Sequence, residues 1–255
     1  MVLEKVIVGA PFGNYLKFPH TTPTLGTFTA EYRGGLTYRA WRVLRTVRYY
    51  HAMQAWTNKL GLPNPGVAYL RGLSRESTVK SIVSVSARSG DDWKTVLIAA
   101  DSTKPLAIEM NVSCPNCGDN DDTDYEHIFS WAKRNTLTPL IVKLPPVNYE
   151  GYVTQAVNVA GIFNFHCCNT LPTPCGGMSG KPLQQLSLRC VHYITNLSGI
   201  SSPNILIGGG GVTSIEDAQR FFDAGCTNVS VASALFFPWN WLRIENMASR
   251  AKESC

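Results

Sequence analysis

The sequence predicts a single α/β domain folded as a (β/α)8 TIM barrel. Eight short runs of β-branched or apolar residues recur along the 255-residue chain, and helical segments separate them without a break in composition. A length of about 250 residues is typical of such a barrel. We therefore expect one domain over residues 1–255. A doubly wound open sheet is the alternative, and it usually needs fewer strands.

The expected elements follow one another in a regular order. Strands are expected at residues 5–8, 52–57, 81–86, 106–112, 140–144, 162–168, 205–207 and 228–231, each an apolar run bounded by turn residues. Helices are expected at residues 37–49, 91–100, 125–134, 149–160, 182–197, 215–224 and 239–252. The helix at 215–224 has the clearest start, because Thr213 and Ser214 can cap it and two acids follow in its first turn.

Composition narrows the class of protein further. Hydrophobic residues make up 44% of the chain and charged residues 16%, which excludes disorder as the main state. Residues 1–11 lack the long apolar stretch of a signal peptide, so we expect a cytoplasmic location. No apolar run approaches the roughly 18 to 20 residues that cross a bilayer, so no membrane contact is predicted. The eight irregularly spaced cysteines predict reduced thiols rather than a disulfide framework.

Polar and glycine-rich segments follow the expected strands where a barrel carries its reacting groups, at the carboxyl ends. The fifth expected strand contains Lys143. The other segments are Asn-Val-Ser-Cys-Pro-Asn at 111–116, Cys-Cys-Asn-Thr at 167–170, four glycines at 208–211 and Val-Ala-Ser-Ala at 231–234. We expect all of them to surround one site.

The four glycines at 208–211 precede a helix start, where backbone amides and the helix dipole can meet an anion. This pattern favours a phosphate cradle, since barrels often bind phosphate at their seventh and eighth strands. A tight strand-to-helix turn is the alternative, but it explains one or two glycines more easily than four.

Lys143 stands inside an apolar strand, so its ammonium needs an anionic partner or a ligand. Glu109 precedes Asn111 by two residues on the neighbouring strand and can share the inward face. Contact with a ligand and a buried ion pair with Glu109 are therefore both open.

Cys114 admits two chemical interpretations. With Cys117 it forms a C-x-x-C, but zinc needs about four ligands and no second pair of suitable spacing follows. A single cysteine between Asn111 and Asn116 better fits a proton acceptor, so we expect no metal site. Cys190 and Cys226 are expected to be small buried side chains.

Together these motifs resemble the dihydroorotate dehydrogenases, FMN-containing barrels of pyrimidine biosynthesis. The resemblance covers most of the chain and keeps the order of the family's motifs. It is carried by residues 58–64, 111–116, 141–146, 169–170, 176–183, 207–212 and 232–235, which read N-K-L-G-L-P-N, N-V-S-C-P-N, I-V-K-L-P-P, N-T, G-G-M-S-G-K-P-L, I-G-G-G-G-V and A-S-A-L.

The resemblance implies FMN-dependent oxidation of dihydroorotate to orotate, an oxidoreductase reaction on a CH–CH group. Cys114 would be the base, as in the soluble classes of the family, and Lys143 would contact the N1/O2 edge of the flavin. The residues implied for the substrate are Asn58, Lys59, Leu60, Gly61, Leu62, Asn111, Asn116, Asn169 and Thr170. Those implied for FMN are Ala10, Asn111, Lys143, Cys168, Gly180, Gly210, Gly211, Ala232 and Ser233.

The chemistry agrees with these roles. The reaction removes a proton from C5 of the substrate and a hydride from C6, so a base must face one side of the ring and the flavin N5 the other. Asparagine amides suit a pyrimidine edge because they donate and accept hydrogen bonds at once. A lysine stabilises the negative charge that develops on the reduced flavin.

The chain departs from the family in the segment after the first strand. Glu31 aligns where the family usually has a lysine, and either Arg33 replaces that cation or the pocket takes a different substrate. The alternative function is therefore a flavin barrel that acts on another pyrimidine, of dihydropyrimidine or tRNA-dihydrouridine type, or a flavoprotein with an altered substrate.

Partners follow from the resemblance and from charge. The family implies a small-molecule substrate and a homodimer. It leaves the electron acceptor open between fumarate and an NAD-linked partner subunit. The basic cluster Arg33, Arg39, Arg42, Arg45 and Arg48 drifts around a helix and predicts a solvated flank, so no nucleic acid is expected. The acidic residues at 119–124 lack the EF-hand glycine and predict a solvated loop.

Overall fold

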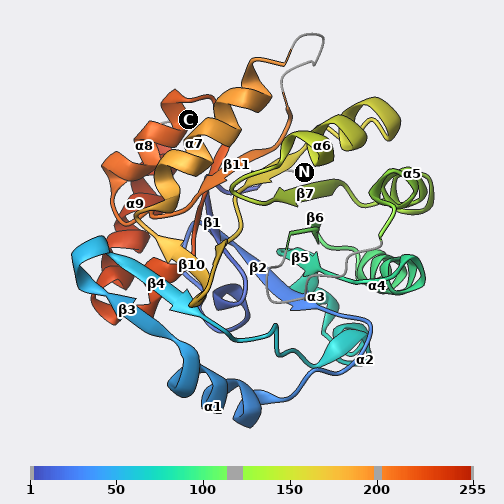
Figure 1. Cartoon of the computed structure of the whole chain (residues 1–255), viewed down its shortest axis with the longest axis horizontal. Coiled ribbons are helices and arrows are strands. Elements are labelled where there is room, and N and C mark those ends of the chain that lie inside the picture. Colours follow the sequence, from blue (N-terminus) through green and yellow to red (C-terminus); the bar gives the residue numbers. More distant parts are fainter. Residues whose placement is uncertain (1–2, 114–122, 198–202, 254–255) are drawn as a thin grey trace.

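The computed structural model describes residues 3–113, 123–197 and 203–253 (Figure 1). Within these residues, eight parallel strands close a barrel in the order β1-β12-β11-β8-β7-β6-β5-β2, and helices surround it. The predicted fold class is therefore confirmed. Each helix of the described residues is too short or too polar to span a bilayer.

The barrel strands are β1 Val6–Val8, β2 Thr21–Phe28, β5 Ile82–Val85, β6 Ala107–Asn111, β7 Leu140–Leu144, β8 Phe165–Cys167, β11 Leu206–Gly209 and β12 Asn228–Val231. The helices are α1 Leu36–Thr46, α2 Gly66–Arg71, α3 Arg75–Thr78, α4 Gly90–Ser102, α5 Tyr125–Asn135, α6 Glu150–Thr154, α7 Leu183–Thr195, α8 Ile215–Asp223 and α9 Trp241–Glu253. A π-helical segment, η4 Gln155–Val159, continues α6, so the predicted helix at 149–160 is present with a changed pitch.

The second barrel strand was wrongly predicted. The segment expected at 52–57 overlaps β4 Ala55–Asn58, which lies in a separate sheet with the order β3-β4-β10-β9. The second barrel strand is β2, whose Pro23 and Gly26 weaken its strand pattern because proline lacks an N–H and glycine marks an irregularity. The register between β2 and β5 does shift between Leu25 and Phe28.

The separate sheet is antiparallel and lies beside the carboxyl ends of the barrel strands. It consists of β3 Arg48–Tyr50, β4, β9 Leu171–Thr173 and β10 Gly176–Gly180. Because β9 follows β8 after three residues, the chain enters this sheet directly from the barrel mouth. The sheet therefore brings segment 58–64, which follows β4, to the same end.

The barrel interior is apolar at the amino-terminal end of the strands and polar nearer their carboxyl ends. One apolar cluster fills the amino-terminal end and consists of Leu3, Ile7, Ile82, Ala107, Ile141, Ile205 and Ile207. Side chains on one face of a strand recur every two residues, so the next inward positions are polar or lack a side chain. These positions include Ser84, Glu109, Lys143 and Gly209. The larger apolar cluster lies between the strands and the helices and includes Trp93, Phe129, Phe165 and Phe221.

Asp217, in the first turn of α8, ties together the turns that follow β10 and β11. Its carboxylate accepts hydrogen bonds from Lys181 Nζ at 2.5 Å, from Gln184 Nε2 at 2.9 Å, and from both the amide and the hydroxyl of Thr213. Burial alone would raise the pKa of Asp217, but these donors outweigh it and lower the pKa to about 2. The ionised carboxylate thus fixes the glycine-rich turn against the start of α7.

We expect Asp217→Asn to lower the free energy of unfolding at pH 7 by about 2 kcal/mol, because an amide loses the ion pair with Lys181. A carboxyl whose pKa is lowered on folding stabilises the protein above its unfolded pKa, so the difference should shrink as the pH falls from about 4 toward 2. Urea unfolding followed by circular dichroism measures both effects. Asp223→Asn at the exposed end of the same helix is the matched control, and an equal loss there would contradict the assignment.

Candidate active site

A cavity of about 140 Å³ opens at the carboxyl ends of the barrel strands. Its walls come from the ends of β1, β7, β8, β11 and β12 and from β4 and β10 of the separate sheet. It brings together a set of residues that the sequence analysis assigned to one site, namely Ala10, Asn58, Leu60, Lys143, Cys168, Asn169, Thr170, Gly180, Gly210, Gly211, Ala232 and Ser233. The polar ends of separate strands therefore do meet in one space.

Other predicted site residues lie elsewhere. Lys59, Gly61, Leu62 and Asn111 do not line the cavity, although the first three adjoin Leu60. Cys114 and Asn116 lie outside the described residues, as do Cys117 and the acidic segment 119–122. The cavity also contains residues that the sequence analysis did not assign, among them Phe12, His166, Ser230 and Phe236.

A buried polar network lies beneath the cavity and centres on Glu109, which is 0% exposed. One carboxylate oxygen accepts a hydrogen bond from Ser84 Oγ at 2.7 Å and lies 3.5 Å from Lys143 Nζ. The other lies 2.7 Å from Nδ1 of His166. Lys143 therefore forms the ion pair with Glu109 and also lines the cavity, so its contact with a ligand stays a prediction.

Glu109 and His166 in this network have different protonation states at neutral pH. Burial alone would raise the pKa of Glu109, but Lys143, His166 and Ser84 outweigh it and lower the pKa to about 2. Burial and then the charge of Lys143 lower the pKa of His166, and Glu109 opposes them. The carboxylate is therefore ionised at neutral pH, and the imidazole is neutral.

His166 is a functional candidate that the sequence analysis missed. The residue is 2% exposed, lies in register with Lys143 on the neighbouring strand, and lines the cavity two residues before Cys168. A histidine inside the mostly apolar run at 162–168 is the signal that could have identified it, because its two-residue spacing from Cys168 places both on one face.

Asparagine amides form a second fixed group. Asn169 Nδ2 donates to Asn111 Oδ1 at 2.8 Å and to the carbonyl of Ser113 at 3.0 Å. Its Oδ1 accepts from the amide of Thr170 at 2.9 Å. These bonds fix which way the Asn169 amide faces, which is the condition for matching a heterocycle edge.

The turn after β11 has the geometry of an anion cradle. Gly210 and Gly211 have φ angles of 102° and 71°, in the left-handed region that other residues rarely adopt. A Cβ at Gly210 would lie 2.9 Å from Cβ of Leu183. Ser233 begins the short helix η5 Ser233–Phe236 after the neighbouring strand β12 and lines the same cavity. The backbone amides of the glycine turn and Lys143 form a donor set, and the aromatic rings of Phe12 and Phe236 add apolar surface, so these groups together fit FMN.

Cys168 lines this cavity, whereas the buried thiols of Cys167, Cys190 and Cys226 lie outside its lining, and all four are packed among apolar groups. Burial raises the pKa of Cys168 to about 12 and that of Cys226 to about 12, and it raises that of Cys167 as well. The Sγ atoms of Cys167 and Cys190 lie 3.2 Å apart behind β8. The interpretation of Cys190 and Cys226 as buried side chains is confirmed. Because Cys167, Cys168 and Cys226 stay protonated at neutral pH, they are poor candidates for a catalytic base.

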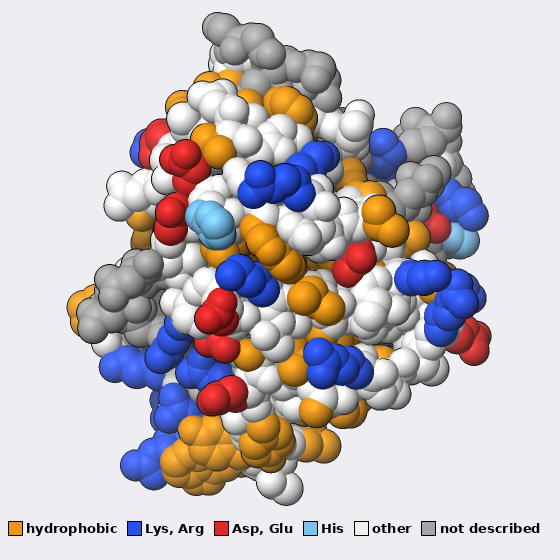
Figure 2. All heavy atoms as spheres, turned by 90° about the vertical axis from the view of Figure 1, so that its right-hand side faces the viewer, with side chains coloured by type: hydrophobic (Ala, Val, Ile, Leu, Met, Phe, Trp, Pro, Cys, Tyr) orange, Lys and Arg blue, Asp and Glu red, His pale blue; other side chains and the backbone are white. Residues whose placement is uncertain are grey.

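Helix α1 holds segment 58–64 through two of its arginines. Arg39 donates to the carbonyl of Pro63 at 2.5 Å, and Arg42 donates to the carbonyls of Leu60 and Lys59. The predicted solvated flank is therefore partly a set of structural contacts. The helix has no buried residue, and Figure 2 shows hydrophobic side chains gathered beside Lys and Arg at the level of α1. Its exposed apolar residues are Leu36, Tyr38, Trp41 and Leu44.

Glu31 and Arg33, the departure from the family pattern, do not line the cavity. Glu31 is exposed, and the Arg33 amide donates to the carbonyl of Asn64 at 2.8 Å.

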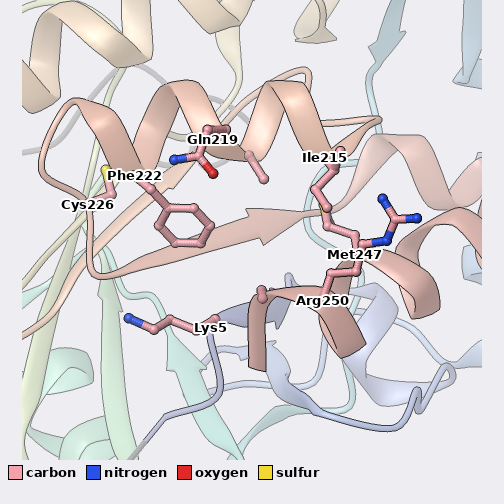
Figure 3. A pocket seen from close by; sticks show the side chains of 9 residues that line it. Lys5, Ile215, Gln219, Phe222, Cys226, Met247 and Arg250 are labelled. Atoms are coloured by element: carbon pink, nitrogen blue, oxygen red, sulfur yellow. The ribbon is translucent and has the colours of Figure 1, made fainter. Parts of the chain in front are cut away.

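A second cavity, of about 290 Å³, lies between α8, α9 and the residues before β1 (Figure 3). Its lining includes Lys5, Phe222, Cys226, Met247 and Arg250 and contains none of the predicted site residues. Among the described residues, no group of three or more His, Cys, Asp and Glu side chains could hold a metal ion.

Comparisons with known proteins agree with the fold and the motif order. The family model for dihydroorotate dehydrogenase matches residues 22–245. A dihydroorotate dehydrogenase B (NAD(+)) catalytic subunit from Alkaliphilus oremlandii is 30% identical over 227 residues, covering 79% of this chain and 74% of that protein. The corresponding catalytic subunit from Listeria monocytogenes serotype 4b is 28% identical over 218 residues, covering 75% of this chain and 70% of that protein.

Solved structures support the architecture independently. The ligand-free dihydroorotate dehydrogenase of Eimeria tenella superposes with a TM-score of 0.72 at 18% identity, covering 98% of this chain and 82% of that one. Its complex with ferulenol gives a TM-score of 0.75 with the same identity and coverage. At this identity the likeness shows the barrel fold. Because the family model matches residues 22–245, which are most of this chain, the chain belongs to the dihydroorotate dehydrogenase family of oxidoreductases.

Proposed function

We propose that this protein oxidises dihydroorotate to orotate with FMN in pyrimidine biosynthesis. One observation carries the proposal beyond family membership: a single cavity collects Lys143, Asn58, Asn169 and the glycine turn after β11. A cation, paired amides and an anion cradle are the groups that a flavin phosphate and a pyrimidine require.

The cofactor would occupy the side of the cavity formed by β7, β11 and β12. Backbone amides at Gly210, Gly211, Ala232 and Ser233 would hold its phosphate, while Lys143 would meet the N1/O2 edge. Ala10, Asn111, Cys168 and Gly180 would complete its surroundings. Bound FMN supplies a hydride acceptor at N5. The protein's part is to orient the ring and to place positive charge where negative charge develops.

The substrate would lie beside the amide groups. Asn58, Asn111, Asn116 and Asn169 would match the donors and acceptors of the pyrimidine ring, with Thr170 at one edge. Segment 58–64, through Lys59, Leu60, Gly61 and Leu62, would close the other side. The bond between Asn169 and Asn111 supports this arrangement, because it fixes both amides before a ligand enters.

Cys114 would remove the proton from C5 while the hydride leaves from C6. Its predecessor Ser113 supports this role, because the Ser113 carbonyl accepts the 3.0 Å hydrogen bond from Asn169. The chain therefore passes beside the cavity one residue before Cys114. The three buried thiols with raised pKa values are poorer candidates for the same step.

The relatives named as NAD(+)-type catalytic subunits support an NAD-linked electron-transfer subunit as the partner of this chain. A homodimer remains a prediction of the family resemblance, and a cytoplasmic location remains a prediction from the composition of residues 1–11. The exposed apolar residues of α1 support a protein contact there, since large apolar side chains gathered on one face often mark an interface.

The purified protein should carry, or take up, FMN with its visible absorption band, and that band should bleach when dihydroorotate is added without oxygen. Bleaching by a different dihydropyrimidine, or by dihydrouridine in tRNA, with no response to dihydroorotate would replace the substrate proposed here. Failure to bind FMN would contradict the whole assignment.

Cys114→Ala should slow the reduction of bound flavin by dihydroorotate at least about a hundredfold, because the C5 proton loses its acceptor. Stopped-flow absorbance measures this rate, and the FMN content of the variant should equal that of the wild type. Cys175→Ala, which removes an exposed cysteine, is the matched control. Equal rates in wild type and the Cys114 variant would show that another group is the base.

Gly210→Ala should weaken FMN binding at least about tenfold, because the turn would lose its left-handed conformation and its approach to the phosphate. Gly161→Ala is the control, since Gly161 also has a positive φ, 62°, but an added Cβ there meets nothing within 4 Å. Fluorescence titration of the FMN-free proteins measures both affinities. A similar loss in both variants would indicate a general effect of backbone strain.

A further inference from the structure

His166 is a buried titratable residue to which the proposed function assigns no role. It lies on the floor of the cavity, between the strands that carry Lys143 and Gly209. Its Nδ1 is 2.7 Å from the carboxylate of Glu109. A structural role alone would require that one contact, yet the ring also reaches the ligand space.

The hydrogen bond to Glu109 determines the state of the ring. An ionised carboxylate can only accept, so Nδ1 of His166 must carry the proton of the neutral imidazole. Nε2 is then the basic nitrogen. A Cβ added to Gly209 would lie 3.5 Å from Nε2, so the missing side chain at Gly209 leaves this nitrogen uncovered on the cavity side.

We propose that His166 takes up a proton when the flavin in the cavity is reduced. The inference rests on the proposed function, because it requires that flavin. A hydride brings two electrons and one proton, which leaves the bound flavin one negative charge richer. One proton from solvent then binds Nε2 of His166, so the protein gains the compensating positive charge without forming a covalent bond.

The charges around His166 favour this response. Among the described residues, Glu109 faces it from β6 and Lys143 from β7, while β11 and β12 present the uncharged Gly209 and Ser230. Among the described residues that face His166, Lys143 is the only cation and Glu109 offsets its charge, so His166 is the group that can add positive charge when the cavity gains a negative one. Burial and Lys143 keep the imidazole neutral before reduction, and a nearby negative charge then raises its affinity for a proton.

The test is the pH dependence of the flavin reduction potential, measured by spectroelectrochemistry on the FMN-loaded protein without substrate. In the wild type, the slope near pH 7 should correspond to about two protons per electron pair, and it should fall to about one at higher pH. His166→Asn keeps a donor toward Glu109 but cannot be protonated, so its slope should correspond to about one proton throughout.

Thr24→Val is the matched control, because Thr24 is also fully buried in the barrel and its hydroxyl has no hydrogen-bond partner among the described residues. Its slope should match that of the wild type. A wild-type slope of about one proton near pH 7 overturns the inference without any variant, and so does a slope of about two that persists in His166→Asn. If His166→Asn does not fold, the wild-type slope together with a proton-release measurement on reoxidation decides.

The outcomes separate this inference from the function beneath it. Failure of the protein to bind FMN overturns both. FMN that binds and is bleached by dihydroorotate, but is reduced with about one proton near pH 7, leaves the proposed function intact and overturns the role of His166 alone.

Discussion

The buried carboxylate of Glu109 is the interaction on which the rest of the site depends. An ionised carboxylate away from water is costly unless hydrogen bonds and charges compensate it. Here Ser84, Lys143 and His166 do so from β5, β7 and β8. Each of the three side chains is thereby held at a defined height in the barrel, and the removal of any one leaves the carboxylate undercompensated.

This network lies at the boundary between two halves of the barrel interior. Along each strand the inward face repeats every two residues, so Ile141 is followed by Lys143 and Ile207 by Gly209. The isoleucines close the amino-terminal end and exclude water from below. The polar groups in the next layer are therefore shielded from solvent on the amino-terminal side. The cavity above them opens only toward the carboxyl ends of the strands.

Much of this arrangement follows from local sequence. Strands β7 and β12 were predicted with their observed bounds because they are uninterrupted apolar runs, and the shared face of Glu109 and Asn111 follows from the two-residue period. Strand β2 was missed because Pro23 and Gly26 break the pattern that identifies a strand. Strand β4 has the alternation of a barrel strand, and its composition does not reveal that its partners are β3 and β10.

Some contacts in the site could likewise not be predicted from the sequence. Lys143 and the glycine turn could be assigned because each is recognised from a single strand and the residues that follow it. The pairing of His166 with Glu109 could not, since those residues lie 57 positions apart and on strands separated by β7. Their contact requires the closed curvature of the barrel, which brings alternate strands together across its interior and which no spacing in the sequence encodes.

The arginines of helix α1 have a structural role that their spacing in the sequence does not show. Arginines on a helix without buried residues suggest a surface for polyanions, yet Arg39 and Arg42 bind backbone carbonyls of segment 58–64. A carbonyl accepts a guanidinium hydrogen bond whatever side chain its residue carries, so this support leaves the side chains of the segment available to a ligand. The exposed helix therefore contributes to the site by fixing the backbone beside the cavity, and this accounts for part of the basic cluster without a nucleic-acid partner.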